Sequence, residues 1–190
     1  MKGIIFNILE AYLLENAGEE KLDHIIASAE LSTRDPFVAP GTYPDEDFLK
    51  IVGQATEEFG WSHAEFFRHL GKFAFFKLAE RYPGFVSPHR DPKEFLKTID
   101  QVVHVEVRKL YTDTYLPTFT YREPSPRELV ITYYSKRKMY DLMEGLIEGV
   151  ATYFAVGIEQ THRIYTEDEI EYCDFYLNFL PDHEKRTSDN

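Results

Sequence analysis

The sequence predicts an α+β fold, in which a helical N-terminal half packs on a C-terminal antiparallel sheet of about four strands. Apolar residues recur at helical spacing as far as about residue 111, and after Pro117 the period changes to that of strands. A second alternating run, over residues 157–180, places apolar side chains on one face and polar ones on the other, which is typical of a half-solvated sheet. Helices followed by strands in this order indicate the α+β class.

Length and composition limit what the chain can be. With 190 residues, it is near the usual size of one domain, and we expect this domain to cover residues 1–181, followed by a polar, frayed tail over 182–190. A hydrophobic content of 43%, with 15% aromatic residues, exceeds what a simple core needs. This surplus hints at an internal pocket.

Charge and cysteine usage argue against several classes of protein. The net charge of -12 would repel a nucleic-acid backbone. Cys173 is the single cysteine, so no internal disulfide is expected, and the N-terminus is poorly flanked for a secretory signal. No apolar run approaches the roughly 20 residues that span a bilayer. We therefore expect a cytoplasmic protein with neither a nucleic-acid nor a membrane partner.

Four helices are expected in the first half of the chain. Ser62 and Glu65 form a capping box. The helix that they begin is nearly apolar all round in its second half, so we expect it to be buried on several sides. A proline-containing loop over residues 32–44 separates two of the helices. The four helices are expected over residues 3–15, 19–29, 45–59 and 62–82.

A fifth helix is expected over residues 92–111, because Asp91 suits its N-cap and Pro92 its first turn. Its apolar stripe consists of Leu96, Ile99, Val103, Val107 and Leu110. Helical periodicity puts His104 at the edge of this stripe, beside Val107. The imidazole can point into a cavity, or it can be an ordinary surface histidine, and spacing leaves both readings open.

His69 is a rival candidate for a functional imidazole. It lies on the same helical face as Phe66, Phe73 and Phe76, and a histidine flanked by aromatic residues is more often a satisfied core residue. The sequence contains no glycine-rich phosphate loop, paired-cysteine metal motif or nucleophile elbow. The sequence therefore contains none of the common motifs that would indicate one of the major enzyme classes.

Strands are expected over residues 118–122 and 128–134. Alternate side chains of an extended segment share a face, so Tyr133, Ser135 and Arg137 can converge on one ligand. Two hydroxyl donors and a guanidinium fork suit carboxylates. The alternative is a polar patch in which Arg137 pairs with one of the many acidic residues.

A helix over residues 138–154 follows these strands. Its apolar stripe adjoins Gly145 and Gly149, where a flat object or another helix could approach closely. Ordinarily such a stripe is core, but beside a carboxylate-binding group it could equally be the wall of a pocket. That pocket would suit a large apolar ligand that carries acidic groups.

Four pieces of the sequence together resemble the haem nitric oxide/oxygen binding (H-NOX) family, which includes the haem domain of soluble guanylate cyclase. They are "MKGIIFNILE" at the start, "VVHVEVRKLY" around His104, Pro117, and "YYSKRKMYDLMEGLIEG". The resemblance covers residues 1–181, and the joint occurrence of these pieces is far more specific than any one of them. It implies an H-NOX fold that holds haem b between the helical half and the sheet.

The resemblance also implies roles for individual residues. His104 would be the proximal iron ligand, and Tyr133, Ser135 and Arg137 would bind the haem propionates. Ile5 and Pro117 match positions that press on the macrocycle and distort it, which is one way in which a protein tunes iron chemistry. Leu142 and Leu146 would line the cofactor.

The matching distal positions indicate which gas is bound. Family members that hold dioxygen use a distal tyrosine, and the matching positions here are Leu142, Leu9 and Ala74. Without a donor, oxygen affinity should fall by about 10- to 150-fold, because a hydrogen bond to a charged partner contributes roughly 1.5 to 3 kcal/mol. We predict a non-enzymatic sensor that binds nitric oxide and carbon monoxide at a ferrous haem and discriminates against oxygen. A stable oxygen complex would instead mean that Tyr140 or Tyr12 reaches the iron.

The same resemblance implies how a signal is produced. Nitric oxide would weaken or break the bond between iron and His104, and the helix over residues 92–111 would then relax. A switch of this kind needs two states and a partner that prefers one of them. The sequence shows no recognisable output domain, so a separate histidine kinase or cyclic-di-GMP enzyme is expected as the partner.

The chain departs from the pattern of those members that hold a structural zinc with three cysteines and a histidine. His162 and Cys173 match two of these ligands, but Tyr165 and Asp141 stand where cysteines are expected. We therefore predict no stoichiometric zinc.

Two other classes of function compete with the sensor. One is a cofactor-free protein-interaction module of the same fold. The other is an enzyme that uses His104 or His69 as a general base. Apart from Glu106, the sequence offers this enzyme no nearby nucleophile or orienting carboxylate at the spacing of a catalytic motif.

Overall fold

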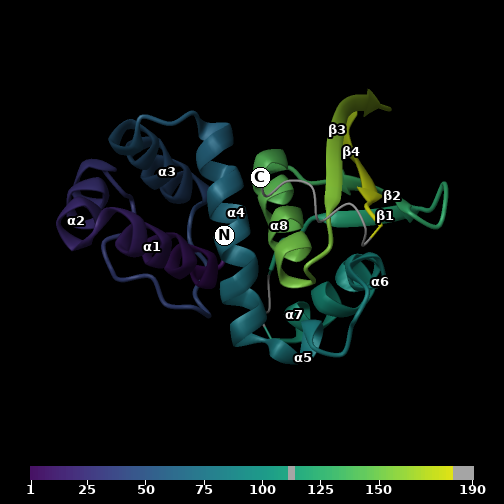
Figure 1. The fold of residues 1–190 in the computed structure, drawn as a ribbon. Helices are drawn as coiled ribbons and strands as arrows, with labels where there is room; N and C mark the ends of the chain where they lie inside the picture. Colours follow the sequence, from purple (N-terminus) through teal and green to yellow (C-terminus); the bar gives the residue numbers. More distant parts are fainter. Residues whose placement is uncertain (111–113, 182–190) are drawn as a thin grey trace.

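The N-terminal lobe is helical, as the sequence predicts (Figure 1). In the computed structural model, which describes residues 1–110 and 114–181, it consists of α1 (Gly3–Ala17), α2 (Glu19–Ser28), α3 (Asp45–Phe59) and α4 (His63–Arg81). The expected capping box at the start of α4 is confirmed, since the Ser62 hydroxyl accepts from the Glu65 backbone N–H and the Glu65 carboxylate accepts in return. The predicted polar tail over residues 182–190 lies outside the described residues.

This lobe has a closely packed core. Its fully buried side chains come from α1 to α4, and they include Phe6, Leu9, Leu13, Ile25, Phe48, Ile51 and Phe66. One carboxylate is also buried, that of Asp47, and it accepts hydrogen bonds from the backbone N–H and hydroxyl groups of both Ser32 and Thr33. These bonds fasten the start of the loop over residues 32–44 to α3.

The C-terminal lobe contains an antiparallel sheet with the strand order β1-β2-β4-β3. Its strands are β1 (Thr118–Arg122), β2 (Glu128–Tyr134), β3 (Ile158–Glu167) and β4 (Ile170–Phe179). The inner face of β4 buries Cys173, Phe175, Leu177 and Phe179, which confirms the alternation read from the sequence. The segment expected as one alternating run is therefore a hairpin. Its turn uses Asp168 and Glu169, both with positive φ, which is the backbone of a two-residue hairpin loop.

Helix α8 (Tyr140–Tyr153) lies between the sheet and α4 (Figure 1). It begins two residues later than predicted because Lys138 has a φ of 50°, which is outside the helical region. Glycines allow α4 and α8 to touch: a Cβ on Gly145 would overlap the Arg68 carbonyl oxygen, and one on Gly71 would overlap that of Leu142. The sequence left open whether a flat ligand or another helix lies against Gly145, and the structure places helix α4 there.

The continuous helix predicted over residues 92–111 is wrong in its middle. The segment is built as α6 (Pro92–Thr98), a π-helical stretch η1 (Ile99–Val103) and α7 (His104–Leu110), while residue 111 lies outside the described part. A π-helix inserts an extra residue into the turn, which a search for a helical period of 3.6 does not detect. A short helix α5 (Pro83–Val86), also not predicted, precedes α6. Within the described residues, no helix is both long and apolar enough to cross a membrane.

Candidate functional site

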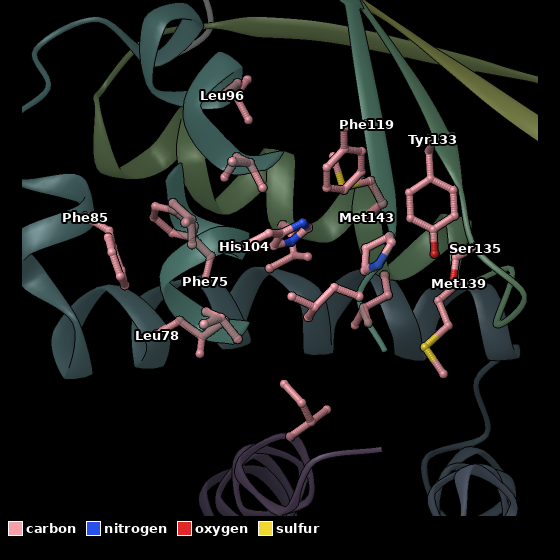
Figure 2. A pocket seen from close by; sticks show the side chains of 18 of the residues that line it. Phe75, Leu78, Phe85, Leu96, His104, Phe119, Tyr133, Ser135, Met139 and Met143 are labelled. Carbon is pink, nitrogen blue, oxygen red and sulfur yellow. The ribbon is translucent and has the colours of Figure 1, made fainter. Parts of the chain in front are cut away.

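A cavity of about 330 Å³ lies between the helices and the sheet. Its lining comes from α1, from α4 to α7, from β1 and β2, and from α8. Figure 2 shows His104 near its middle, Phe85 toward one end, and Tyr133 and Ser135 toward the other. The cavity walls are mostly aliphatic and aromatic, and polar side chains gather at the end that contains Ser135.

His104 begins α7 directly after the π-helical stretch and is buried. Its imidazole stacks on the Phe119 ring, with centroids 5.4 Å apart. Among the described residues, the Nδ1 atom has no partner at hydrogen-bond geometry, and the carboxylate oxygen Asp100 Oδ1 is 3.5 Å away. Burial lowers the pKa of His104, which favours the neutral imidazole. A neutral imidazole is the form that binds metals.

Tyr133, Ser135 and Arg137 do come together at one rim of the cavity. Tyr133 and Ser135 are buried, and the Tyr133 hydroxyl is directed toward Ser135 (Figure 2). The Ser135 hydroxyl accepts from the Arg137 backbone N–H at 3.2 Å. Burial raises the pKa of Tyr133, so this phenol stays protonated and can donate.

The Arg137 side chain also pairs with an acidic residue of the protein, which was the alternative to a ligand-binding role. Its Nε and Nη2 atoms donate to the two Asp45 carboxylate oxygens at 2.6 and 3.1 Å, and Nη1 donates to the Tyr115 carbonyl at 2.7 Å. Asp45 lies at the start of α3, so this fork joins the cavity rim to the N-terminal lobe. The geometry demonstrates that the rim can grip a carboxylate.

Most of the predicted apolar contacts line the cavity, and two do not. Ile5, Pro117, Leu142 and Leu146 are on its wall. Leu9 and Ala74 are instead buried in the core of the N-terminal lobe, because their positions on α1 and α4 face that core. In the structure, these two residues therefore have a packing role and do not form the cavity wall.

The sequence does not identify several of the lining residues. Phe75, Leu78 and Ala79 lie on α4 and Tyr82 directly follows it, and the spacing of three, four and seven residues shows that they share a face. This spacing identifies the residues as one apolar face of the helix, but it does not show whether that face borders a cavity or a closed core. Phe85, Val86 and Phe95, which the sequence also does not identify, line the cavity as well.

Three alternative side chains lie away from the cavity wall. His69 is exposed and stacks on Trp61, with centroids 4.6 Å apart, so it is not the buried imidazole of this site. The Tyr140 hydroxyl donates to Glu171 at 2.7 Å, and Tyr12 packs in the aromatic core beside Phe66. Neither tyrosine is among the described residues that line the cavity.

The residues considered for zinc do not assemble a metal site among residues 1–110 and 114–181. His162 Nδ1 donates instead to the buried Glu144 carboxylate at 2.7 Å. Burial raises the pKa of the Cys173 thiol to about 12, which disfavours the thiolate that zinc requires. The absence of bound zinc stays a prediction for metal analysis.

The site has the features needed to hold a flat, largely apolar cofactor that carries acids on one edge. A buried imidazole, whose Nδ1 is unpartnered in the described part of the chain, opens onto apolar walls, and carboxylate-binding donors occupy one rim. This donor set fits iron protoporphyrin, which needs an axial nitrogen and partners for its carboxylates. The fold and the site thus define a cofactor-binding domain.

The chain belongs to the Haem-NO-binding family, whose sequence model matches residues 2–162. Its cofactor is accordingly haem, and its class of function is haem-based gas sensing. The structure also resembles that of the Fe(II) unliganded H-NOX protein from K. algicida, with a TM-score of 0.86 and 30% identity over 96% of this chain and 98% of that one.

Two structures of an H-NOX protein from S. oneidensis are similar as well. A mutant of that protein in the Fe(II) ligation state has a TM-score of 0.87 and 26% identity, over 96% of this chain and 97% of that one. The Fe(II)NO state has a TM-score of 0.87 and 25% identity, over 95% of this chain and all of that one (100%). These likenesses confirm the predicted α+β fold.

Proposed function

We propose that this chain is a nitric oxide sensor whose haem is bound through His104 and which discriminates against oxygen. The observation that carries the proposal is the buried His104 imidazole on an apolar cavity whose rim holds Tyr133, Ser135 and Arg137. The sensor domain covers residues 1–181 and also binds carbon monoxide.

Each group in the cavity has a separate task. A bound ferrous haem would supply the iron that takes up a diatomic gas. His104 would hold the iron through a ring nitrogen, and the stacked Phe119 ring restricts how its imidazole can turn. Tyr133, Ser135 and Arg137 would bind the two haem propionates. The Arg137 guanidinium would then bind a propionate either together with Asp45 or in place of it. Ile5 and Pro117 press on the ring from the cavity wall.

Discrimination against oxygen follows from the apolar wall. Bound oxygen gathers negative charge and is stabilised by a hydrogen-bond donor, whereas nitric oxide needs no such donor. Leu142 and Leu146 offer none, and the hydroxyl of Tyr140 is engaged by Glu171 outside the cavity. Oxygen affinity is therefore about 10- to 150-fold below that of a site with a distal donor.

Signalling is assigned to the segment that carries His104. If His104 lost its bond to the iron, η1 and α7 would be free to relax, and a π-helical stretch is a frequent feature of functional sites. The two resulting states are read by a separate cytoplasmic histidine kinase or cyclic-di-GMP enzyme, and this chain itself catalyses no reaction.

The test is a ferrous absorption spectrum recorded anaerobically, with nitric oxide, and in air. We expect an intense Soret band that shifts with nitric oxide and no stable oxygen complex. A stable oxygen complex would contradict the selectivity, and Tyr82, the lining tyrosine at the junction of α4 and α5, would be the first residue to replace. Protein that stays colourless after hemin titration would favour the cofactor-free interaction module.

A further inference from the structure

We propose that Asp100 is a positioning residue that holds the His104 imidazole and sets the strength of its bond to iron. This inference rests on the proposed function, because it needs His104 to be the axial ligand. It assigns a purpose to His104 Nδ1, the buried nitrogen that has no hydrogen-bond partner among residues 1–110 and 114–181.

The Asp100 carboxylate lies close to the imidazole. Asp100 and His104 are four residues apart on the segment that joins η1 to α7, and Asp100 Oδ1 lies 3.5 Å from His104 Nδ1. This separation is about half an ångström longer than a normal hydrogen bond. Hydrogen bonds in functional sites are often long before the ligand binds and shorten afterwards. A small rotation of either side chain would close this gap.

The Asp100 carboxylate is itself held in place. The Phe119 backbone N–H donates to Asp100 Oδ1 at 3.4 Å, and the Asp100 backbone N–H donates to the Tyr121 hydroxyl at the same distance. Both partners belong to β1, the strand that follows Pro117. Asp100 therefore lies at a junction between the histidine helix and the strand beside it, and its side chain is only 21% exposed.

A carboxylate beside a metal-bound imidazole changes the bond to the metal. A carboxylate that accepts the Nδ1–H fixes the tautomer and raises the electron-donating strength of the other nitrogen. By strengthening the bond of His104 to iron, Asp100 would oppose the rupture of that bond when nitric oxide binds. Asp100 would thus set how much of the nitric oxide complex keeps His104 bound.

The experiment replaces Asp100 in the haem-loaded protein. Asp100→Asn keeps the size of the side chain and an oxygen for the Phe119 N–H, but removes the charge. Glu106→Gln is the matched control, because Glu106 is a carboxylate on α7 that pairs with Lys109 at 2.6 Å. The readouts are the iron–histidine stretching frequency of the ferrous protein by resonance Raman and the fraction of the nitric oxide complex that keeps His104 bound.

We expect Asp100→Asn to lower the stretching frequency and to shift the nitric oxide complex toward released His104 by about 10-fold, the size expected for one charge-assisted hydrogen bond. Glu106→Gln should change neither. In the diamagnetic carbon monoxide complex, the His104 Nδ1–H proton should move upfield in Asp100→Asn, which tests the bond even if the variant is less stable.

The possible outcomes separate the two proposals. An iron–histidine frequency that is the same in wild type, Asp100→Asn and Glu106→Gln would overturn the role of Asp100 while leaving His104 as the ligand. A wild-type protein with no iron–histidine band would instead overturn the ligand assignment itself, and the role of Asp100 with it.

Discussion

One buried polar group in the N-terminal lobe and one in the C-terminal lobe have opposite surroundings. In the N-terminal lobe, the Asp47 carboxylate is surrounded by donors from Ser32 and Thr33. In the C-terminal lobe, the His104 Nδ1 atom is buried without a hydrogen-bond partner from the part of the chain that the structure describes. A buried polar atom usually has a partner, so an exception calls for an explanation. The difference indicates that the hydrogen bonds to Asp47 stabilise the fold, whereas His104 belongs to a site that lacks a partner, as the proposed haem ligand would.

The largest effect is expected at the site of His104. His104→Gly should abolish the Soret band, or make it depend on added imidazole, because the axial nitrogen is lost. Absorption spectra with and without imidazole check this. His69→Gly is the control and should keep the band, since His69 is exposed and packs on Trp61. Equal loss in both variants would break the contrast between the two histidines.

The next largest effect is expected where the lobes meet. Gly145→Ala places a Cβ against the Arg68 carbonyl, which forces α4 and α8 apart. Overpacking of this kind costs about 3 kcal/mol of unfolding free energy. Gly53→Ala on α3 has open space around it and should be neutral or slightly stabilising. Urea unfolding of both variants measures the difference, and equal stabilities would contradict the backbone contact.

Acid should weaken the N-terminal lobe through Asp47. Burial alone would raise the pKa of Asp47, but the hydrogen bonds from Ser32 and Thr33 outweigh it and lower this pKa to about 2. Since the folded pKa is depressed, the stabilisation, about 2 kcal/mol, is present above about pH 4 and is lost as the pH falls toward the folded pKa. Asp47→Asn should therefore be less stable at neutral pH, and the gap should narrow in acid.

Urea unfolding at neutral pH and at about pH 3 measures how the stability difference between wild type and Asp47→Asn changes. Glu46→Gln is the control, because Glu46 is the exposed neighbour of Asp47. The haem spectrum of Asp47→Asn should match wild type at neutral pH. A changed spectrum would show that the haem site depends on the hydrogen bonds of Asp47 in the N-terminal lobe.

The smallest effect is a gain. Leu142→Tyr adds a hydroxyl to the cavity wall and should raise oxygen affinity by about 10-fold. Leu142→Phe adds similar bulk without the donor and should not. Oxygen titration of the ferrous proteins distinguishes them, and an equal response in both variants would argue against hydrogen bonding as the basis of selectivity.

Much of the framework could be predicted from the sequence, because periodicity reports which face of each element is buried. Helices and strands near their observed limits, the inner face of β4 and the convergence of Tyr133, Ser135 and Arg137 all follow from spacing. The π-helical stretch could not be predicted, since its extra residue leaves the stripe of apolar side chains nearly unchanged.

The rest of the site depends on contacts between distant segments. The fork between Arg137 and Asp45 joins residues 92 positions apart, and many other acids were equally available in the sequence. Periodicity also could not distinguish Leu9 and Ala74, which face the closed core, from Phe75 and Leu78, which face the cavity. All four are apolar positions on helices, and only the way in which α1 and α4 pack in the folded protein separates them.

The glycine contacts between α4 and α8 have a mechanical consequence. At Gly71 and Gly145 the two helices meet backbone to backbone, so at these points no flexible side chain lies between them to absorb a small sliding movement. Any reorientation of one lobe against the other must then occur as a roll about this line of contact. The crossing of the two helices would be the axis of that rotation.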